Sequence, residues 1–497
     1  MSGTAMGAGR RAIPRRAASA DPRAGQDQTL LALVVMALLA VVVALSAVGA
    51  GTIARPLFMV FALVICWMAR RRSPWLYLSA TLWFWLITAF VRRMIEWRGG
   101  FNSGDIVLAT PSLTALLILP DILKCRGLLT RPGVGYALLL FACVMYGLFV
   151  SFVHGELLAG SYAGVDWVIP VFYLFLFICN AERIDEAEAH VATFMTFSLL
   201  FVVPYSLYQY FLMPDWDAVW LVQSGMGSIG HPLPMDSRVF GPVNNPGMLA
   251  VWLGTCLVLL SYFRGRVLLL LTPFIFLLVM IGMVRAVYGS VILAMIVGVA
   301  TGRGGFGRLL MVALAVGVSG YIGLAVLNPV VTDQITKRLQ SMQNLSADDS
   351  AQVRAQIYAE TPALINANPF GLGLGSQGRG QAAQASGPLA TVNVDSGPLS
   401  VFLALGWGAG SLYIFGIVML IFRTLFIGRR YDSGVASAMA AASIVAFGTF
   451  PFINVIGFDG VVMWICLGYP LAVEIRATGA VPSGATPPAR RRLTGSA

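Results

Sequence analysis

From about residue 29 to residue 475, the chain alternates between long apolar runs and short polar connectors. A helix rises ~1.5 Å per residue, so ~20 apolar residues cross the ~30 Å hydrocarbon core of a bilayer. Backbone polar groups in lipid must be paired internally, and the runs are too uniformly apolar for barrel strands, so each run is predicted to be a helix. The runs that qualify lie near 29–50, 53–69, 74–91, 104–123, 134–153, 164–181, 190–212, 246–263, 267–284, 286–302, 308–327, 397–422, 435–454 and 457–475.

Two polar stretches interrupt this pattern. The longer one covers 328–396 and the shorter one covers 213–245. We therefore predict an all-α polytopic integral membrane protein with about 12–14 transmembrane helices. Its main helix bundle spans 29–327, its large loop is helical, and its last transmembrane helices lie in 397–475.

The composition agrees with a membrane protein. Of the 497 residues, 58% are hydrophobic and 11% are charged, with a mean hydropathy of +0.80. A soluble domain has ~25% charged residues, so this chain cannot cover itself with a polar surface, and its solvent is predicted to be lipid. The tails 1–28 and 476–497 are basic and rich in Ala, Gly and Pro, so we expect both to be disordered.

The net charge of +11 is distributed in a way that predicts topology and not nucleic-acid binding, because the basic residues gather at the ends of apolar runs. With the amino-terminal tail in the cytoplasm, alternation places most basic connectors there too: Arg70 to Arg72, Lys124, Arg126, Arg131, Arg264, Arg266, Arg303, Arg308, Arg429 and Arg430.

One connector disagrees with this alternation. Arg92, Arg93 and Arg98 fall on the opposite side, which indicates either a re-entrant segment or a miscounted pair of spans between 74 and 123. Both interpretations keep an even number of spans with both termini in the cytoplasm. In a bacterium, the two polar stretches would then lie on the periplasmic face of the inner membrane.

The large loop contains a predicted helix followed by a glycine-rich segment. Asp348 or Asp349 is expected to cap a helix that runs to about Asn366, and Asn368-Pro369 is expected to stop it. The glycines of the sequence Gly371-Leu372-Gly373-Leu374-Gly375 suit a tight turn or a backbone that approaches another segment closely.

Three arginines are candidates for binding a ligand, because each lies at a predicted outer membrane edge or in an outer loop: Arg238, Arg285 and Arg354. Each has a simpler alternative. Arg285 would snorkel to lipid headgroups, Arg354 would be a solvated helix charge, and Arg238 would pair with Asp236 or another acid. Their shared side of the membrane favours function, because guanidinium groups bind diphosphate oxygens bidentately and stay charged.

Other polar groups offer fewer candidates. Asp395, where the large loop re-enters the membrane, is either a general base or a helix cap in competition with Ser396. Asp459, near an outer span edge, could pair with an arginine, and His231 is expected to be a turn residue. The chain has no HExxH, Walker loop or GxSxG, and no metal site or cofactor is expected.

The order of several motifs resembles the O-antigen ligase/polymerase superfamily over about residues 200–425. These motifs are Arg238 to Pro246 (RVFGPVNNP), Val284-Arg285-Ala286, Arg354 followed by Asn368 to Gly373 (NPFGLG), and Asp395-Ser396 with Leu405 to Gly408 (LGWG). The resemblance implies a glycosyltransferase of the GT-C class that uses a glycan on undecaprenyl diphosphate, without a metal. It also implies that Arg238, Arg285 and Arg354 bind the diphosphate, and that a flippase and a chain-length regulator are partners.

One departure separates this chain from the ligases of that superfamily. They carry a His-Asn pair where the loop returns to the membrane, and here the sequence is Val394-Asp395-Ser396. We therefore favour a polymerase of O-antigen, capsule or exopolysaccharide, with Asp395 as the base for the acceptor hydroxyl. The alternatives are a ligase acting on lipid A core or another acceptor, a transporter or flippase of polysaccharide precursors, and a scaffold protein. The transporter would require charges near mid-span, and few are found there.

Overall fold

The computed structural model describes residues 22–125, 127, 133–263, 265–301, 349–376 and 396–478. Within these residues it contains helices and no extended strand, which confirms the all-α prediction. Nine of the described segments are long and apolar enough to cross a membrane: α1 (Pro22–Ala47), α2 (Gly51–Arg72), α3 (Pro74–Gly99), the segment Ile106–Lys124, α6 (Val134–Val153), α7 (Leu157–Cys179), α8 (Ile184–Leu212), α17 (Gly397–Arg430) and α19 (Gly457–Ala477). Four described apolar helices are shorter: α10 (Pro246–Leu259), α11 (Arg266–Ile281), α12 (Arg285–Thr301) and α18 (Gly434–Phe447).

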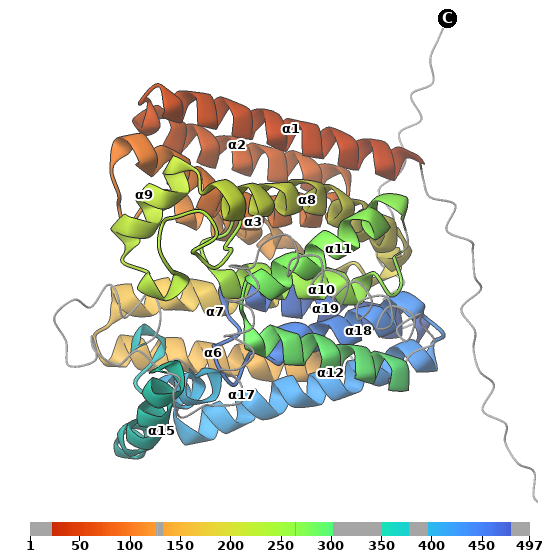
Figure 1. Cartoon of the computed structure of the whole chain (residues 1–497). Helices are drawn as coiled ribbons and strands as arrows, with labels where there is room; N and C mark the ends of the chain where they lie inside the picture. Colours follow the sequence, from red (N-terminus) through yellow and green to blue (C-terminus); the bar gives the residue numbers. More distant parts are fainter. Residues whose placement is uncertain are drawn as a thin grey trace, which may run out of the picture.

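The helices lie roughly side by side in one bundle (Figure 1). The last helix, α19, is central, because every residue of its apolar window is buried. It packs against α7, α18, α17 and α10. Around this centre, α1 and α2 form one side and α6, α12 and α17 form another, and large apolar side chains such as Phe61, Phe149, Ile296 and Phe426 are exposed on these helices. An exposed apolar belt of this kind is typical of a bundle in lipid.

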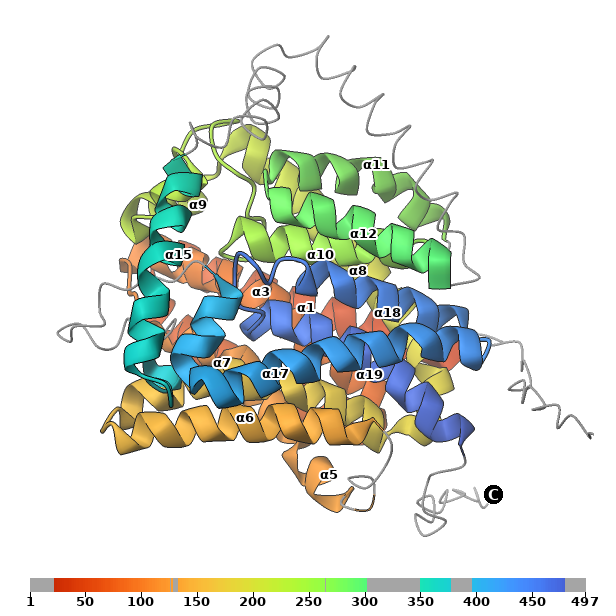
Figure 2. The ribbon, with the colours of Figure 1, turned by 90° about the horizontal axis from the view of Figure 1, so that it is seen from below.

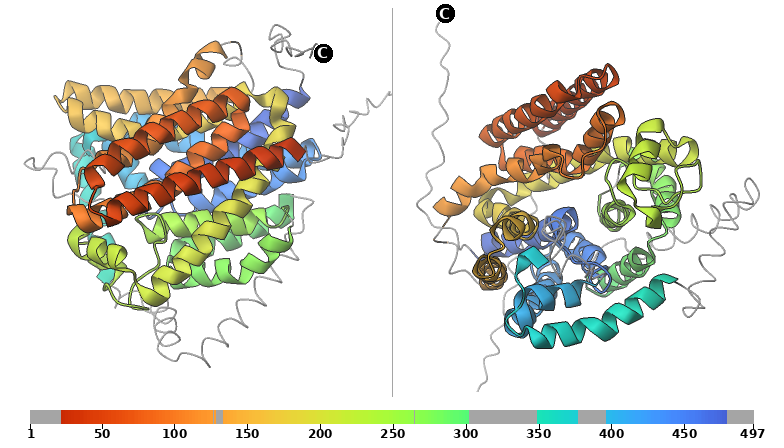
Figure 3. Two further views of the ribbon diagram at one scale, coloured as in Figure 1. Left: turned by 90° about the horizontal axis from the view of Figure 1, so that it is seen from above. Right: turned by 90° about the vertical axis from the view of Figure 1, so that its left-hand side faces the viewer.

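Two shorter helices lie at one end of the bundle. They are α9 (Asp215–Ser224) and α15 (Asp349–Ala367), both at the left of Figures 1 and 2. We call this end the loop end; the right-hand panel of Figure 3 views it along the bundle. The basic residues at the start of α11 and the end of α17 lie at the opposite end (Figure 2). This arrangement agrees with the alternation of the charge pattern, and the cytoplasmic location of the termini stays a prediction.

Several boundaries differ from the expectations. The first helix begins at Pro22, before the expected start of the span, and polar contacts anchor its first turns: Asp27 pairs with Arg72 at 2.6 Å, and Gln28 donates to the Ser79 hydroxyl at 2.7 Å. Helix α19 continues to Ala477, so the described chain is helical at the edge of both expected tails. The expected span 308–327 lies outside the described residues.

Within the region 74–123, two segments are long and apolar enough to cross a membrane, as the sequence predicted. Helix α3 is continuous from Pro74 to Gly99. The segment after it is broken into short pieces: η1 (Ile106–Ala109), α4 (Thr110–Ala115), η2 (Leu116–Ile118) and α5 (Leu119–Lys124). Pro111 and Pro120 lie in the first turns of α4 and α5, where a missing amide hydrogen is tolerated.

Helix α17 is also broken, at Gly406, where φ is +71° and ψ is −179°. The glycine-rich segment 368–376 supplies the hydrogen bonds that the break removes. The carbonyls of Leu403 and Ala404 accept from the amides of Leu372 (2.8 Å) and Gly373 (2.9 Å), and the Trp407 amide donates to the carbonyl of Pro369 (3.0 Å). A broken membrane helix is stable only when its free backbone groups are paired in this way.

The same contact explains the glycines, as the sequence predicted. A Cβ atom on Gly371 would lie 2.6 Å from the Gly406 amide nitrogen, and one on Gly406 would overlap the carbonyl of Pro369. On its other side, the segment lies against α6, where the Ser151 hydroxyl accepts from the Gly375 amide at 2.9 Å. The segment is therefore a close backbone contact between α6 and α17.

Candidate functional site

Arg238 follows a short turn at the loop end. Gly230 and Ser237 form an antiparallel bridge, and the Arg238 amide donates to the carbonyl of Ile229 at 2.7 Å. Asp236 in this turn lies 3.1 Å from His231, with both side chains well exposed, so His231 occupies a turn as the sequence predicted. Arg238 itself is partly buried, and its Nε donates to the carbonyl of Gly282 at 3.1 Å.

That contact brings Arg238 to the start of α12. Gly282 and Met283 belong to the tight turn between α11 and α12, and Arg285 is the first residue of α12. Met283 has a φ of +54°, a left-handed conformation that costs a residue with a side chain about 1–2 kcal/mol. The Arg238 side chain therefore reaches the turn that precedes Arg285, and both arginines are partly buried. We call this part of the loop end the corner.

The corner has the electrostatics of an anion site. Two guanidinium groups bring two permanent positive charges, and the amino-terminal end of α12 adds the positive end of a helix dipole. Both arginines are only partly buried, so each retains a surface that faces outside the protein. Two bidentate donors near a helix start suit a diphosphate better than a single carboxylate.

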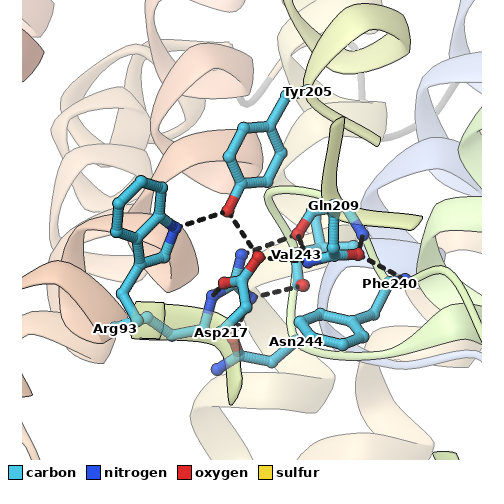
Figure 4. A network of polar contacts seen from close by, with 9 residues as sticks. Arg93, Tyr205, Gln209, Asp217, Phe240, Val243 and Asn244 are labelled. Atoms are coloured by element: carbon cyan, nitrogen blue, oxygen red, sulfur yellow. Dashed lines mark hydrogen bonds and ion pairs between the residues drawn. The ribbon is translucent and has the colours of Figure 1, made fainter. Parts of the chain in front are cut away.

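A third arginine, Arg93 on α3, holds the loop that follows Arg238 (Figure 4). Its side chain is fully buried. Its Nη1 donates to the carbonyl of Val243 and to Oδ1 of Asn244, each at 2.8 Å, and its Nη2 donates to the carbonyl of Gly241 at 2.6 Å. Its Nε forms an ion pair with Oδ1 of Asp217 at 2.7 Å.

Asp217 in the first turn of α9 completes the network. Its second oxygen accepts from the Tyr205 hydroxyl at 2.7 Å and from the Gln209 amide at 2.6 Å. Burial raises the pKa of the Asp217 carboxyl, while Arg93 and these hydrogen bonds act in the opposite direction. The carboxylate form of Asp217 therefore depends on Arg93, and the two residues form one unit.

No role for Arg93 was predicted from the sequence, where it was only an exception to the charge pattern. The structure accounts for two of the three arginines in the exception, because Arg93 is paired inside the protein and the neighbouring Arg92 pairs with Glu96 at 2.7 Å, whereas Arg98 is exposed. Buried and paired arginines do not report the side of the membrane in the way that free connector charges do. The usable signal was a charged residue inside an apolar run, which is a functional candidate by default.

The other predicted site residues are less completely described. Arg354 lies on α15, whose described range of Asp349–Ala367 agrees with the predicted helix, but its side chain is outside the described part. Asp395 lies outside the described residues. Its neighbour Ser396 is buried at the start of α17 and lies 2.9 Å from the Tyr358 hydroxyl of α15, so α15 is joined to the entry of α17.

Within the described residues, Asp459 forms no pair with an arginine. It is 3% exposed, and its Oδ1 has no hydrogen-bond partner there. The next residue, Gly460, packs against Pro170 of the apolar helix α7. No group of three or more His, Cys, Asp or Glu side chains within the described ranges is placed to hold a metal ion.

No family model and no curated protein matches this chain.

Proposed function

We propose that the protein is a membrane glycosyltransferase that polymerises a polysaccharide from undecaprenyl-diphosphate-linked repeat units. The observation that carries this proposal is the joining of Arg238 to the turn before Arg285 through the carbonyl of Gly282. Arg238 and Arg285 are 47 positions apart in the sequence. Each belongs to one of the motifs that resemble the O-antigen ligase/polymerase superfamily. Their common corner is the feature that a lipid diphosphate site requires.

The proposed reaction transfers a growing glycan to a hydroxyl of the next lipid-linked repeat. The acceptor oxygen bonds to the anomeric carbon, the bond from that carbon to the diphosphate oxygen breaks, and undecaprenyl diphosphate leaves. Negative charge develops on the departing diphosphate, so Arg238 and Arg285 would stabilise the transition state more than the ground state. Asp395 is the proposed base that takes the acceptor proton, and Arg354 is the proposed third diphosphate ligand.

The location follows from the same proposal. The loop end would face the periplasm of a bacterial inner membrane, where lipid-linked repeats arrive after a flippase has moved them. A chain-length regulator is the second expected partner. A ligase that transfers the glycan to lipid A core or another acceptor is the alternative within the same chemistry.

A complementation experiment tests the function. Cells that lack the protein would receive the wild type, Arg238→Ala, Arg285→Ala or the control Arg266→Ala, which changes an exposed arginine at the start of α11, at the opposite end of the bundle. Protein levels in the membrane would be matched by immunoblot, and the glycan would be separated on a gel.

The polymerase proposal expects single repeat units in the deletion strain, a ladder of long chains with the wild type and Arg266→Ala, and loss of the ladder with the other two variants. Long polymer that accumulates on its lipid carrier in the deletion strain would instead indicate a ligase. An unchanged glycan in every strain would overturn the enzyme proposal and favour a scaffold. Lipid-linked repeats that stay on the cytoplasmic side would favour a transporter.

A further inference from the structure

We propose that Arg93 is the positioning residue for Arg238: it fixes the loop 238–247 so that the Arg238 guanidinium lies beside the turn that begins α12. This inference rests on the proposed function, because it assigns Arg93 a role in the same diphosphate site. It is carried by the four acceptors that surround one buried guanidinium, three of which belong to that loop.

Most of the contacts of the Arg93 guanidinium are made to the loop after Arg238. A buried arginine that only balanced a charge would need Asp217 alone. Arg93 instead donates to the backbone of Gly241 and Val243 and to the side chain of Asn244. These are the third, fifth and sixth residues after Arg238, so the loop cannot shift without breaking hydrogen bonds to a charged donor.

Two aromatic rings lie against the Arg93 guanidinium. The guanidinium carbon of Arg93 lies 5.0 Å from the centre of the Phe240 ring and 5.6 Å from that of Trp220 on α9. Phe240 comes two residues after Arg238 and is fully buried. The Arg93 guanidinium therefore contacts the loop in two ways, through the Phe240 ring and through hydrogen bonds. Both kinds of contact restrain the backbone next to Arg238.

Gln209 also forms hydrogen bonds to the loop that Arg93 contacts. Gln209 of α8 accepts from the amides of Phe240 (3.1 Å) and Gly241 (2.8 Å) and donates to Asp217. Helices α3, α8 and α9 thus converge on two residues of the loop, a few positions before the loop enters α10. Arg238 extends from this fixed point to Gly282, so a shift of the loop would move the guanidinium away from the turn that precedes Arg285.

The test replaces Arg93 by lysine. Arg93→Lys keeps a positive charge for Asp217, but a single nitrogen cannot reach the four acceptors that the planar fork reaches. The matched control is Arg92→Lys on the next residue of α3. Arg92 is also almost fully buried, and it bonds Glu96 and the carbonyl of Asn102, not the loop after Arg238.

Purified full-length variants in lipid nanodiscs would be titrated with undecaprenyl diphosphate, and the dissociation constant would be measured per folded molecule. We expect Arg93→Lys to weaken binding about tenfold, as the loss of a charge-assisted hydrogen bond would. We expect Arg92→Lys to change it less than twofold. In the Arg238→Ala background, adding Arg93→Lys should change the dissociation constant less than twofold. The reason is that a residue that acts through Arg238 has no effect on binding once Arg238 is removed.

The outcomes separate the inference from the proposed function. If Arg238→Ala weakens binding but Arg93→Lys leaves it unchanged, or if the two effects multiply in the double variant, the positioning role is wrong and the diphosphate site stands. If the wild type does not bind undecaprenyl diphosphate, or Arg238→Ala binds as the wild type does, the diphosphate site itself is wrong. A lower unfolding temperature with unchanged affinity would assign Arg93 a structural role only.

Discussion

The side chain of Gln209 contacts both the backbone amide and the backbone carbonyl of Gly241. The side-chain oxygen of Gln209 accepts from the Gly241 amide at 2.8 Å, and its nitrogen lies 3.3 Å from the Gly241 carbonyl as a donor. Both groups of Gln209 are buried, and Gly241 is the residue where the loop from Arg238 turns toward α10.

Replacing Gln209 by leucine should destabilise the protein by about 3 kcal/mol or more. The substitution leaves the buried amides of Phe240 and Gly241 without an acceptor, and each unpaired buried group costs about 1–3 kcal/mol. Thermal unfolding in detergent would measure the change. Gln223→Leu, on the exposed face of α9, is the control and should shift the midpoint little. Equal midpoints for the two variants would show that the Gln209 contacts do not stabilise the loop.

Replacing Gly241 by alanine should destabilise the loop and reduce polymer formation. Gly241 has a φ of +56°, and a Cβ atom there would lie 2.6 Å from the Ser206 hydroxyl oxygen, so the strain exceeds the about 1–2 kcal/mol of a left-handed residue. Gly289→Ala is the control, because Gly289 lies inside α12 with open space around it. There alanine should stabilise by up to about 1 kcal/mol. Unfolding midpoints would give both values, and a neutral Gly241→Ala would contradict the described loop.

Replacing Gly406 by alanine should disturb the contact between α17 and the segment 368–376. Gly406 has a φ of +71°, and its Cβ would overlap the Pro369 carbonyl. Gly408→Ala, two residues later and with nothing near the added carbon, is the matched control. Limited proteolysis of the membrane protein would report the difference: Gly406→Ala should expose the segment to cleavage, whereas Gly408→Ala should be cut as the wild type is. Identical digestion of both would show that the break in α17 tolerates a side chain.

Replacing Asp217 by asparagine should cost about 3–5 kcal/mol, because Arg93 would remain buried without its anionic partner. The double variant Arg93→Met with Asp217→Leu removes both charges but leaves the carbonyls of Gly241 and Val243 without their donor, so it should also be destabilised. Its polymer ladder should be absent, since Arg93 would no longer hold the loop. A double variant with full activity would contradict the positioning role of Arg93.

The sequence predicted the elements that lipid imposes and missed the contacts between distant segments. Apolar length alone defines a membrane helix, so most spans agree with the described helices, and Gly371 and Gly373 predicted a close backbone approach because few other constraints require such glycines. Arg93 bonds residues about 150 positions away, and no local pattern encodes such a pairing. Asp459 shows the converse, since its position at a span edge suggested an arginine partner, and its Oδ1 has no hydrogen-bond partner among the described residues.

The segment 368–376 links helices that are synthesised at very different times. Its Gly375 amide bonds Ser151 of α6, which precedes it by 224 residues, while its Leu372 and Gly373 amides bond carbonyls of α17, which leaves the ribosome later. The break at Gly406 can be closed only when this segment is already beside it. The loop end is therefore completed late in biosynthesis, after α17 has been inserted, and a chain truncated before α17 would lack the three backbone hydrogen bonds that join the segment to α17.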